Sequence, residues 1–505
     1  QIRIGSLSLQ LSELESSVVG AQLGSQAIST SLKAGAIGLA IVMVFMIIMY
    51  AVPGIAASLA LAIYTTLVIA TLYLFEITLT LPGIAGIILG IGMAVDANVI
   101  VFARVREEIA TGKSVQTSMK IGFQKAMSAI LDGNITTLIA SVVLMALGSG
   151  TVKGFAYTLM IGIILSLFTA MVVTRYILYS LYALGLKSEK LYGRAKERKS
   201  IDFIGKKAVF FTISGIIIAA GLISMGVHSA TEGKALNYGL DFMGGTSTTA
   251  DFGKDMTIED IENDIVPYVE EVTGDSDVQA TKVEGTTQVT IKTRTLSLDE
   301  RQKLEDTLAE NCDVDASTIT SQSISSTISG EMRSDALKAV IVSCIFMLLY
   351  IWFRFKDIRF AASAILALVH DVLVVITVYA LVRISVGSTF IACVLTIVGY
   401  SINDTIVIFD RIRENLALKT GKQTAEDLRE IANKSLTQTL SRSINTSITT
   451  FIMVVMLYIL GVASIRDFSL PLMAGLVCGA YSSICIATEL WYVMKVHLGK
   501  NKATK

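Results

Sequence analysis

The sequence predicts a polytopic α-helical membrane protein with two pseudo-symmetric halves and a small ferredoxin-like α+β domain on the outer side. Three observations lead to this prediction. Of the 505 residues, 53% are hydrophobic and only 17% are charged. Eleven apolar segments are long enough to cross a hydrocarbon layer of roughly 30 Å. A similar phrase occurs at 92–108 and 399–415, and an acidic block separates the two groups of apolar segments. A soluble protein would have to bury all eleven segments in one core, so that class is excluded.

The apolar segments and the basic residues between them predict the topology. The segments lie at residues 33–50, 54–75, 83–103, 128–148, 153–183, 207–226, 335–353, 361–383, 388–409, 445–461 and 467–494. Short loops rich in Lys and Arg remain in the cytoplasm. Basic residues cluster at 104–125, 187–207, 354–359, 411–434 and 495–505, which marks these stretches as the inner side. Alternation then places residue 1 and residues 228–334 outside and the C-terminus in the cytoplasm.

An internal repeat defines the two halves. Residues 132–140 align with 445–453 at an offset of 313 positions, and the earlier phrases align at an offset of 307. Both copies keep the same orientation, so the repeat is parallel, and transporters of this kind hold their sites near the interface between repeats. The pairs at offset 307 are Gly92/Gly399, Asp96/Asn403, Phe102/Phe409, Arg104/Arg411, Arg106/Arg413 and Glu107/Glu414.

These boundaries predict seven regions. They are a remnant of a first external domain at 1–31, a membrane half at 32–183, a cytoplasmic linker at 184–206, the first helix of the second half at 207–227, an external α+β domain at 228–334, a second membrane half at 335–494 and a cytoplasmic tail at 495–505.

The external block has a net charge of −13, from 21 acidic and 8 basic residues. Its pattern predicts the order βαββαβ, which is typical of a ferredoxin-like domain. It carries no catalytic or phosphate-binding motif, and we interpret its Gly-Gly pair as a kink in a strand. The predicted elements are a strand at 235–252, a helix at 257–272, a hairpin at 278–295 around Glu284-Gly285, a helix at 298–311 and a strand at 317–327.

Charged residues inside the apolar segments are the candidate functional residues. Asp96 and Asp404 lie in the middle of their segments, Asn403 precedes Asp404, and His370 and Asp371 lie in the eighth segment. A charge at the centre of a bilayer costs from about 2.5 to above 10 kcal/mol, so such residues need a partner or a function.

Polar residues gather at the start of the tenth segment. Arg442 begins this segment, and Asn445, Thr446 and Thr449 follow. The spacing of Arg442, Thr446 and Thr449 predicts a polar stripe that faces one neighbouring helix.

Two interpretations of these residues remain open. In the first, a desolvated carboxyl group takes up a proton from one side and releases it to the other when an arginine approaches, with Asp404 and Arg442 in these roles. In the second, the same residues form a static ion pair that fixes helix packing. For Asp371, His370 could be no more than a hydrogen-bonding partner.

The repeat predicts that the two acids are not equivalent. Asp96 aligns with Asn403, whereas Asp404 aligns with Ala97. A shift of one residue turns a side chain by roughly 100° around the helix. We therefore predict Asp404 as the main proton carrier and Asp96 as its partner.

The remaining charges and the cysteines have simpler interpretations. Asp410, Arg104 and Arg411 lie at helix ends and are expected to face cytoplasmic water, while Glu489 and Arg175 are expected to snorkel to the interface. The five cysteines show no CxxC or CxxH spacing, so neither a metal site nor a disulfide framework is predicted.

Several phrases are similar to the signature motifs of SecD and SecF, the bacterial protein-export membrane subunits of the resistance–nodulation–division superfamily. Residues 32–183 resemble SecD, residues 207–494 resemble SecF, and the whole resembles a fused SecDF that lacks the first helix and most of the first external domain of SecD. The SecD-like phrases are 80–109 and 130–140; the SecF-like phrases are 236–246, 366–375, 399–415 and 441–450.

The resemblance implies a non-enzymatic accessory subunit of the Sec translocase in the bacterial inner membrane. It implies protons as the coupling ion and no cofactor. The implied partners are the SecYEG translocon, the translocating preprotein and membrane lipids, with YajC as a further candidate and no nucleic acid. The family's membrane Asp and Arg residues correspond to Asp96, Asp404 and Arg442. The alternatives are a proton-coupled exporter of small molecules or lipids and a scaffold of the translocon that conducts no ions.

Overall fold

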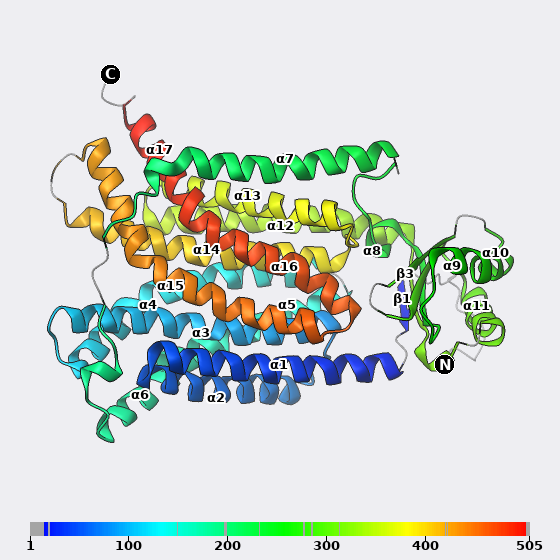
Figure 1. Cartoon of the computed structure of the whole chain (residues 1–505), viewed down its shortest axis with the longest axis horizontal. Coiled ribbons are helices and arrows are strands. Elements are labelled where there is room, and N and C mark those ends of the chain that lie inside the picture. Colours follow the sequence, from blue (N-terminus) through cyan, green and yellow to red (C-terminus); the bar gives the residue numbers. More distant parts are fainter. Residues whose placement is uncertain are drawn as a thin grey trace, which may run out of the picture. The chain divides into compact units, whose positions relative to one another are not determined.

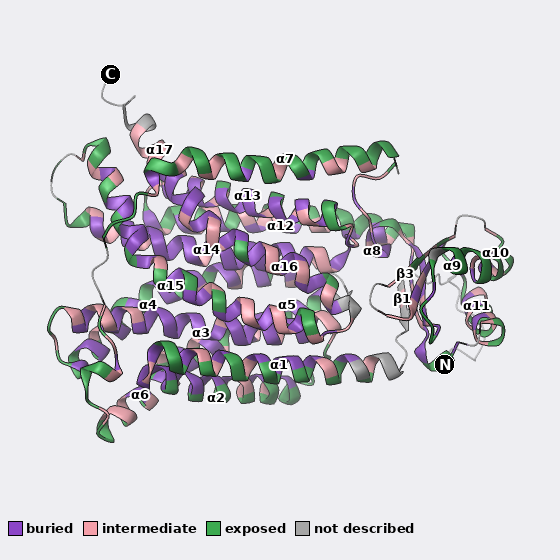
Figure 2. Cartoon of the chain, viewed as in Figure 1, coloured by how far each residue is buried: buried purple, intermediate pink, exposed green. Residues whose placement is uncertain are grey.

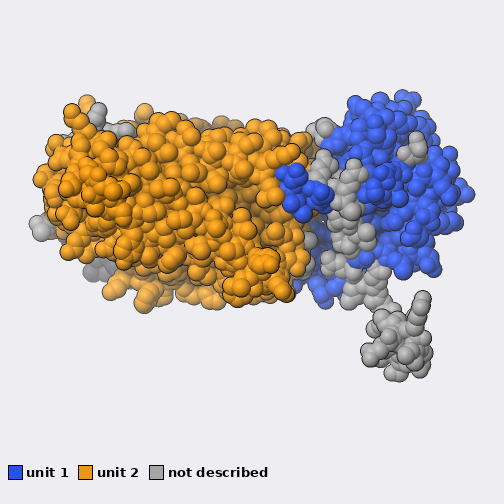
Figure 3. Space-filling model, turned by 90° about the horizontal axis from the view of Figure 1, so that it is seen from below, with its two compact units in different colours: residues 1–29, 238–335 blue, residues 30–237, 336–505 orange. Residues whose placement is uncertain are grey.

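The computed structural model describes residues 15–18, 21–148, 150–195, 199–231, 233–275, 278–283, 286–312, 314–419, 421 and 423–500. The chain forms two compact units (Figure 3). One unit contains residues 1–29 and 238–335, and the other contains residues 30–237 and 336–505.

Eleven helices of the described chain are long and apolar enough to cross a membrane, which confirms the predicted number (Figure 1). Two of the spans are continued through π-helical turns, so α5 with α6 and α16 with α17 each make one span. The helices of these spans are α1 (Ala21–Tyr50), α2 (Val52–Leu74), α3 (Leu81–Ala110), α4 (Val115–Leu147), α5 (Gly150–Phe168), α6 (Thr174–Ala183), α7 (Lys207–Thr231), α12 (Ser326–Phe355), α13 (Ile358–Val382), α14 (Ser388–Ala417), α15 (Ala425–Leu460), α16 (Ala463–Ser482) and α17 (Thr488–Lys500).

Four helices extend well beyond their predicted segments at the predicted inner side. α3 and α14 continue past their arginines, and α4 and α15 start 13 and 20 residues before the apolar stretch. Capping residues set these starts: the Ser114 side chain accepts from Thr117 N, and Thr424 forms a capping box with Asp427. Hydropathy detects only the apolar part of such a helix, so the predicted boundaries were wrong there.

The helices α3 and α14 form the centre of the membrane unit (Figure 2). In the most apolar window of each, 89% and 94% of the residues are buried, against 11% for α7 and 22% for α12. The peripheral helices expose large apolar side chains, such as Ile216 of α7 and Phe353 of α12. This is the pattern expected of helices that face lipid.

Glycines bring each central helix close to a helix of the other half. A Cβ at Gly92 of α3 would lie 2.8 Å from the Cα of Thr450 in α15. A Cβ at Gly399 of α14 would lie 3.2 Å from the Cα of Thr137 in α4, whose hydroxyl donates to the Gly399 carbonyl at 3.1 Å. Small residues at helix contacts allow such approach in membranes. The two contacts are equivalent under the repeat, so α3 packs on α15 as α14 packs on α4.

Both halves interrupt their last span with a π-helical turn, at η1 (Thr169–Val173) and η5 (Ser483–Ala487). The two turns lie 314 positions apart, close to the offset of the surrounding repeat. A π turn adds one residue to the helix and is frequent at functional sites. The sequence analysis did not predict either turn.

The other unit contains a five-stranded antiparallel sheet in the order β1-β5-β2-β4-β3. The last four strands in this order have the ferredoxin-like arrangement, which confirms the predicted topology. β1, from the N-terminal region, extends the sheet by pairing with β5, and the sequence analysis did not predict this strand. The strands are β1 (Glu15–Val18), β2 (Gly245–Asp251), β3 (Gln279–Lys282), β4 (Gln288–Thr293) and β5 (Thr320–Ile324).

The helices of this unit cover an apolar core that includes Val269, Ile291 and Leu308. α11 (Leu298–Asn311) has the predicted bounds and begins with a capping box of Ser297 and Glu300. The predicted helix 257–272 is instead two helices, α9 (Ile258–Asp264) and α10 (Val266–Thr273), because Pro267 cannot donate to a preceding carbonyl.

One predicted strand is partly wrong, and one predicted turn lies outside the described residues. The first part of the strand at 235–252 is loop and a single helical turn, α8 (Leu240–Met243), because Gly244 and Gly245 both adopt positive φ and break the extended chain. β3 and β4 pair as predicted for the hairpin, but its turn residues Glu284 and Gly285 are not among the described residues.

The linker between the halves contacts both halves at the predicted inner side. Ala195 N donates to the Arg106 carbonyl of α3 at 3.2 Å. On the other half, the Asn433 amide oxygen of α15 accepts from Phe203 N and Ile204 N at 3.0 and 3.1 Å, and Arg429 pairs with Asp202 at 2.6 Å. The linker therefore joins α3 to α15, the same two helices that meet at Gly92.

Candidate functional site

The carboxylate of Asp404 lies inside the membrane unit, on the side of α14 that faces α15. The residue is 8% exposed. Its two oxygens accept only long hydrogen bonds, from the hydroxyls of Thr446 and Ser447, each at 3.5 Å. Within the described chain no cation lies within ion-pair distance of it, although Arg442 is near enough for an electrostatic interaction. The carboxylate is therefore buried and weakly held.

Arg442 is also buried, at 7% exposure, and its terminal Nη2 has no hydrogen-bond partner in the described structure. Besides Asp404, its charge interacts with Arg104, Arg411 and Glu107 near the C-terminal ends of α3 and α14. Arg442 thus connects the Asp404 carboxylate electrostatically with a second group of charges nearer the predicted inner side.

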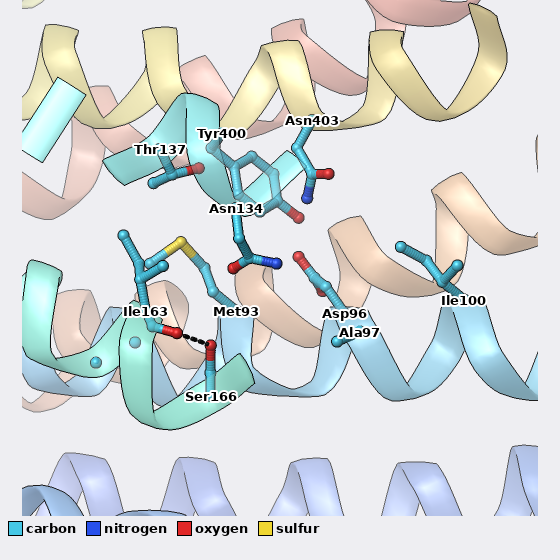
Figure 4. Close-up of a pocket in the computed structure, with 12 residues that line it drawn as sticks. Met93, Asp96, Ala97, Ile100, Asn134, Thr137, Ile163, Ser166, Tyr400 and Asn403 are labelled. Atoms are coloured by element: carbon cyan, nitrogen blue, oxygen red, sulfur yellow. Dashed lines mark hydrogen bonds between the residues drawn. The ribbon is translucent and has the colours of Figure 1, made fainter. Parts of the chain in front are cut away.

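Asp96 and Asn403 occupy equivalent positions on α3 and α14 and line one small cavity between the halves (Figure 4). One oxygen of Asp96 and the amide oxygen of Asn403 have no hydrogen-bond partner among the described residues. The cavity holds about one water molecule, which such groups can bind. Tyr400 and Asn134 also line it, and Figure 4 shows the Asn134 amide directed at Asp96. The neighbourhood of Asp96 therefore differs from that of Asp404.

Thr446 and Thr449 of the predicted polar stripe, and the neighbouring Asn445, make different contacts. Thr446 lies against Asp404, and the Thr449 hydroxyl donates to the Thr446 carbonyl at 2.8 Å. The Asn445 amide instead donates to the Tyr50 hydroxyl of α1 at 2.9 Å. Asn445 points to a different helix from Thr446 because residues at adjacent helix positions diverge by about 100°.

His370 and Asp371 lie away from this group, among α7, α13, α14 and α16. The Asp371 carboxylate is completely buried and accepts from Ser401 at 2.6 Å and from Ser482 at 2.8 Å. It also contacts Cys478 Sγ at 3.2 Å and His370 Nδ1 at 3.0 Å. Ser401 lies three residues before Asp404 on α14. Asp371 therefore contacts α14 about one helical turn away from Asp404.

A potential metal-ligand set exists at the same place. In the described chain, the ligand atoms of His370, Asp371 and Cys478 lie within 4.8 Å of one another. These residue types suit a zinc-like ion. Hydrogen bonds already engage both Asp371 oxygens and both imidazole nitrogens, so the cluster is complete without an ion.

A cluster of five charged side chains joins the ends of α3 and α14 on the predicted inner side. Arg104 pairs with Glu414 of the other half at 3.1 Å, and Arg411 pairs reciprocally with Glu107. Each arginine also pairs with the glutamate three residues later on its own helix, and Arg104 lies 3.9 Å from Asp410.

The prediction that Arg104 and Arg411 face cytoplasmic water was wrong, whereas Asp410 is partly exposed. The two arginines are only 5% and 8% exposed, because the central helices bring the equivalent motifs of both halves into contact. The internal repeat could have predicted this pairing. Each central helix carries an arginine and a glutamate at equivalent positions, and these can pair with the opposite charges of the other central helix.

The prediction that Glu489 snorkels to the interface was also wrong. It follows the π turn η5 and is completely buried, and neither carboxylate oxygen has a hydrogen-bond partner in the described structure, so it does not snorkel. Its equivalent at offset 314, Arg175, is exposed and lies over the rings of Phe123 and Tyr179. The packing of α17 against the bundle explains the difference between these two equivalent positions.

Comparisons with known proteins agree with this architecture. A family model described as "Protein export membrane protein SecD/SecF, C-terminal" matches residues 5–183 and 303–497. The protein translocase subunit SecDF of Bacillus subtilis is 36% identical over 98% of this chain and 68% of its own length. The SecDF subunit of Thermus thermophilus is 34% identical over 100% of this chain and 67% of its own length.

A crystal structure of SecDF from Thermus thermophilus, a translocon-associated membrane protein, is similar with a TM-score of 0.84. It is 34% identical, and the match covers 97% of this chain and 64% of the crystallised chain. The chain therefore spans about two thirds of the length of these relatives.

Proposed function

The chain belongs to the SecD/SecF family of protein export membrane proteins, and we propose that it serves the Sec translocase as a subunit that couples proton transfer to protein export. In this proposal the proton is the coupling ion, no cofactor takes part, and the chain catalyses no covalent reaction. The transported substrate is an unfolded preprotein leaving the SecYEG channel.

One observation carries the proton coupling: three ionisable side chains from three helices meet between the halves without completing their hydrogen bonds. Asp404 has only two long hydrogen bonds, and Asp96 and Arg442 each keep an unpartnered polar atom. A static ion pair would be expected to form short, charge-assisted bonds, because an incompletely paired buried charge is costly. Loose contacts instead favour groups that change partners.

The arrangement supports a simple sequence of events. With Arg442 at a distance, burial favours the neutral, protonated form of Asp404. When α15 brings Arg442 closer, its permanent charge favours the carboxylate, and the proton leaves. Because α15 packs closely on α3 and α14 packs closely on α4, a movement of the α3–α15 pair against the α4–α14 pair would change this distance.

The proposed surroundings follow from the family and the charge distribution. The basic loops favour a bacterial inner membrane orientation with the linker and C-terminus in the cytoplasm and the sheet-containing unit outside. There the acidic unit would meet the emerging preprotein. SecYEG and membrane lipids are the proposed partners, with YajC as an additional candidate.

Substitution Asp404→Asn tests the proposal because it removes the ionisable group at nearly constant shape. We expect export driven by a proton gradient, measured in inverted vesicles, to be lost, together with proton conductance across proteoliposomes. The control is Asp467→Asn, which removes an exposed carboxylate of the same unit.

Normal gradient-driven export by the Asp404→Asn protein would refute the proton path. Retained export with normal assembly would favour the scaffold alternative. Proton-driven efflux of a small apolar compound, without an effect on preproteins, would favour the exporter.

A further inference from the structure

We propose that Tyr400 carries the proton between the two acids of the site, and that its hydroxyl connects the cavity at Asp96 with the Asp404 carboxylate. This inference rests on the proposed function and adds to it a residue through which the coupling proton passes. Without such a residue, the two acids belong to different surroundings with no group between them that can both take up and release a hydrogen.

The position of Tyr400 places its hydroxyl between these surroundings. The residue lies on α14 one helical turn before Asp404, so the two side chains project from the same face of the helix. It is 4% exposed, and both Asp96 and Asp404 are within electrostatic range of its hydroxyl. It also lines the small cavity, where Figure 4 shows the Tyr400 hydroxyl and the Asn403 side chain near Asp96. The tyrosine therefore reaches the cavity from the helix that carries Asp404.

The hydrogen bond that Tyr400 makes in the structure is one that it can leave. Its hydroxyl donates to the Thr446 carbonyl of α15 at 3.2 Å, and the same carbonyl accepts from the Thr449 hydroxyl at 2.8 Å. If the tyrosine hydrogen turns away, the Thr446 carbonyl keeps the shorter of these two bonds. No buried acceptor then loses its last partner, which is the costly event in breaking a buried hydrogen bond.

Other acceptors are available to the hydroxyl on both sides. In the cavity, one oxygen of Asp96 and the amide oxygen of Asn403 have no partner among the described residues. One water molecule there could donate to both and share a third hydrogen bond with Tyr400, which is a normal number of partners for a buried water. On the other side, the Thr446 hydroxyl lies 3.5 Å from Asp404. Tyr400 thus borders the surroundings of both acids.

The proton step balances without a further reactant. Protonated Asp96 gives its proton to the cavity water, the water gives a hydrogen to the Tyr400 oxygen, and the tyrosine's own hydrogen moves to the Asp404 carboxylate. Asp96 is left as a carboxylate, Asp404 becomes the neutral acid, and the tyrosine is neutral before and after. Rotation of the hydroxyl back to the Thr446 carbonyl resets the path. The direction follows from Arg442, whose charge links Asp404 with the charges at the predicted inner side.

The repeat indicates that this connection exists on one side only. At the offset of 307 positions, Met93 stands where Tyr400 stands, and it lines the same cavity without a hydroxyl. At the offset of 313, Gly133 stands where Thr446 stands, and a Cβ at Gly133 would overlap the Asn403 amide oxygen. The first half therefore has neither the hydroxyl nor the threonine beside it, and the path leads from the cavity to the acid of the second half.

Substitution Tyr400→Phe tests the inference because it keeps the ring and removes only the hydroxyl. We expect the proton conductance of proteoliposomes with the full chain to fall on the order of 100-fold, the lower end of what a positioned proton donor contributes. Gradient-driven export in inverted vesicles should fall with it. The matched control is Tyr379→Phe, since Tyr379 of α13 is completely buried and its hydroxyl has no partner in the described structure. This control should conduct as the unchanged protein does.

Two further variants separate proton transfer from packing. Asp96→Asn should reduce conductance, and its combination with Tyr400→Phe should reduce conductance no further, because groups that act as a unit have non-additive effects. Tyr400→His restores a ring that can take up and release a proton, so it should recover part of the conductance that Tyr400→Phe loses. A packing role predicts additive losses instead. It also predicts that the histidine conducts no better than the phenylalanine, which fills the tyrosine site more closely.

Unchanged conductance of the Tyr400→Phe protein would overturn the inference, as would additive losses in the double variant. Detergent unfolding checks that each variant is folded. If Tyr400→Phe is less stable than Tyr379→Phe, the Tyr400→His protein decides: recovered conductance supports the relay, and unrecovered conductance overturns it.

Failure of the proposed function is seen separately from failure of this inference. Asp404→Asn protein that conducts normally would refute the proton path as a whole. Asp404→Asn protein that does not conduct, beside Tyr400→Phe protein that does, would refute only the part assigned to the tyrosine.

Discussion

At the scale of single residues, equivalent positions in the two halves have diverged in what they contact. Asp96 shares a small cavity with Asn403, while Asp404, one position further along α14, lies against Thr446 and Ser447 of α15. The sequence predicted this difference from the one-residue shift alone. It did not predict Ser447 as a contact, because a serine in an apolar helix has no distinguishing pattern before the facing helix is known.

The glycines of the central helices are predicted to control packing between the halves. In Gly92→Ala the new methyl group would press on the backbone of Thr450, so we expect a loss of about 1–3 kcal/mol in the free energy of unfolding. Gly215→Ala is the control, since nothing lies within 4 Å of a Cβ at that position of α7. Unfolding in mixed detergent measures both, and equal stability of the two variants would contradict the close contact.

At the scale of elements, the apolar pattern predicted every membrane helix, but charge alone did not indicate which helix ends meet. A run of apolar residues is needed wherever a helix crosses the bilayer, and the run can be recognised from consecutive residues alone. Whether Arg104 meets water or Glu414 depends on packing between helices more than 300 residues apart. The π turns were missed for a related reason, since one extra residue in an apolar helix leaves its hydropathy unchanged.

The reciprocal ion pairs are predicted to couple α3 to α14. Arg104→Glu should destabilise the protein, because Glu414 and Glu107 would then face a third negative charge. Adding Glu414→Arg should recover part of this loss, with a coupling energy of about 0.5–3 kcal/mol in a double-mutant cycle of detergent unfolding. Arg175→Glu, at an exposed site, is the control. Strictly additive effects of Arg104→Glu and Glu414→Arg would show that the pair is not coupled.

The contact of the linker residue Asp202 with Arg429 of α15 is predicted to weaken at low pH. Hydrogen bonds from Arg429 and from Gly205 N lower the pKa of Asp202 from 3.8 to about 2. Because the folded value is the lower one, the contact contributes its full stabilisation above pH 3.8 and loses it as the pH falls toward 2. Hydrogen exchange of residues 201–206 should accelerate across that interval, and in Asp202→Asn protein it should be fast at every pH. A linker equally protected in both proteins would contradict this role.

At the scale of the whole molecule, the chain consists of two compact units that are built for different surroundings, one for lipid and one for water. The membrane unit hides its polar groups between helices, whereas the other unit has an ordinary apolar core under an acidic surface. The βαββαβ order was predictable from caps and turns. The added strand β1 was not, because its pairing with β5 joins segments about 300 residues apart.

The two units are predicted to lose stability separately. Leu308 is completely buried, so Leu308→Ala should cost the sheet-containing unit about 2–5 kcal/mol. Leu298→Ala, at a residue that is 70% exposed, is the control. Hydrogen exchange on the full chain should show faster exchange in α11 and the sheet, with α3 and α14 unchanged. Faster exchange in the central helices as well would indicate one cooperative unit.

The reciprocal pairing of Arg104 with Glu414 and of Arg411 with Glu107 has a consequence for ancestry. It is the isologous pattern of a two-fold homodimer, in which each copy offers its partner the same two residues. A single ancestral half with the π turn already in place could have assembled in this way as two identical chains. Identical chains cannot place an ionisable residue on one side of their axis only. Once duplication had joined the copies into one gene, Asp404 and His370 could be retained in the second copy while their counterparts became Ala97 and Ile63.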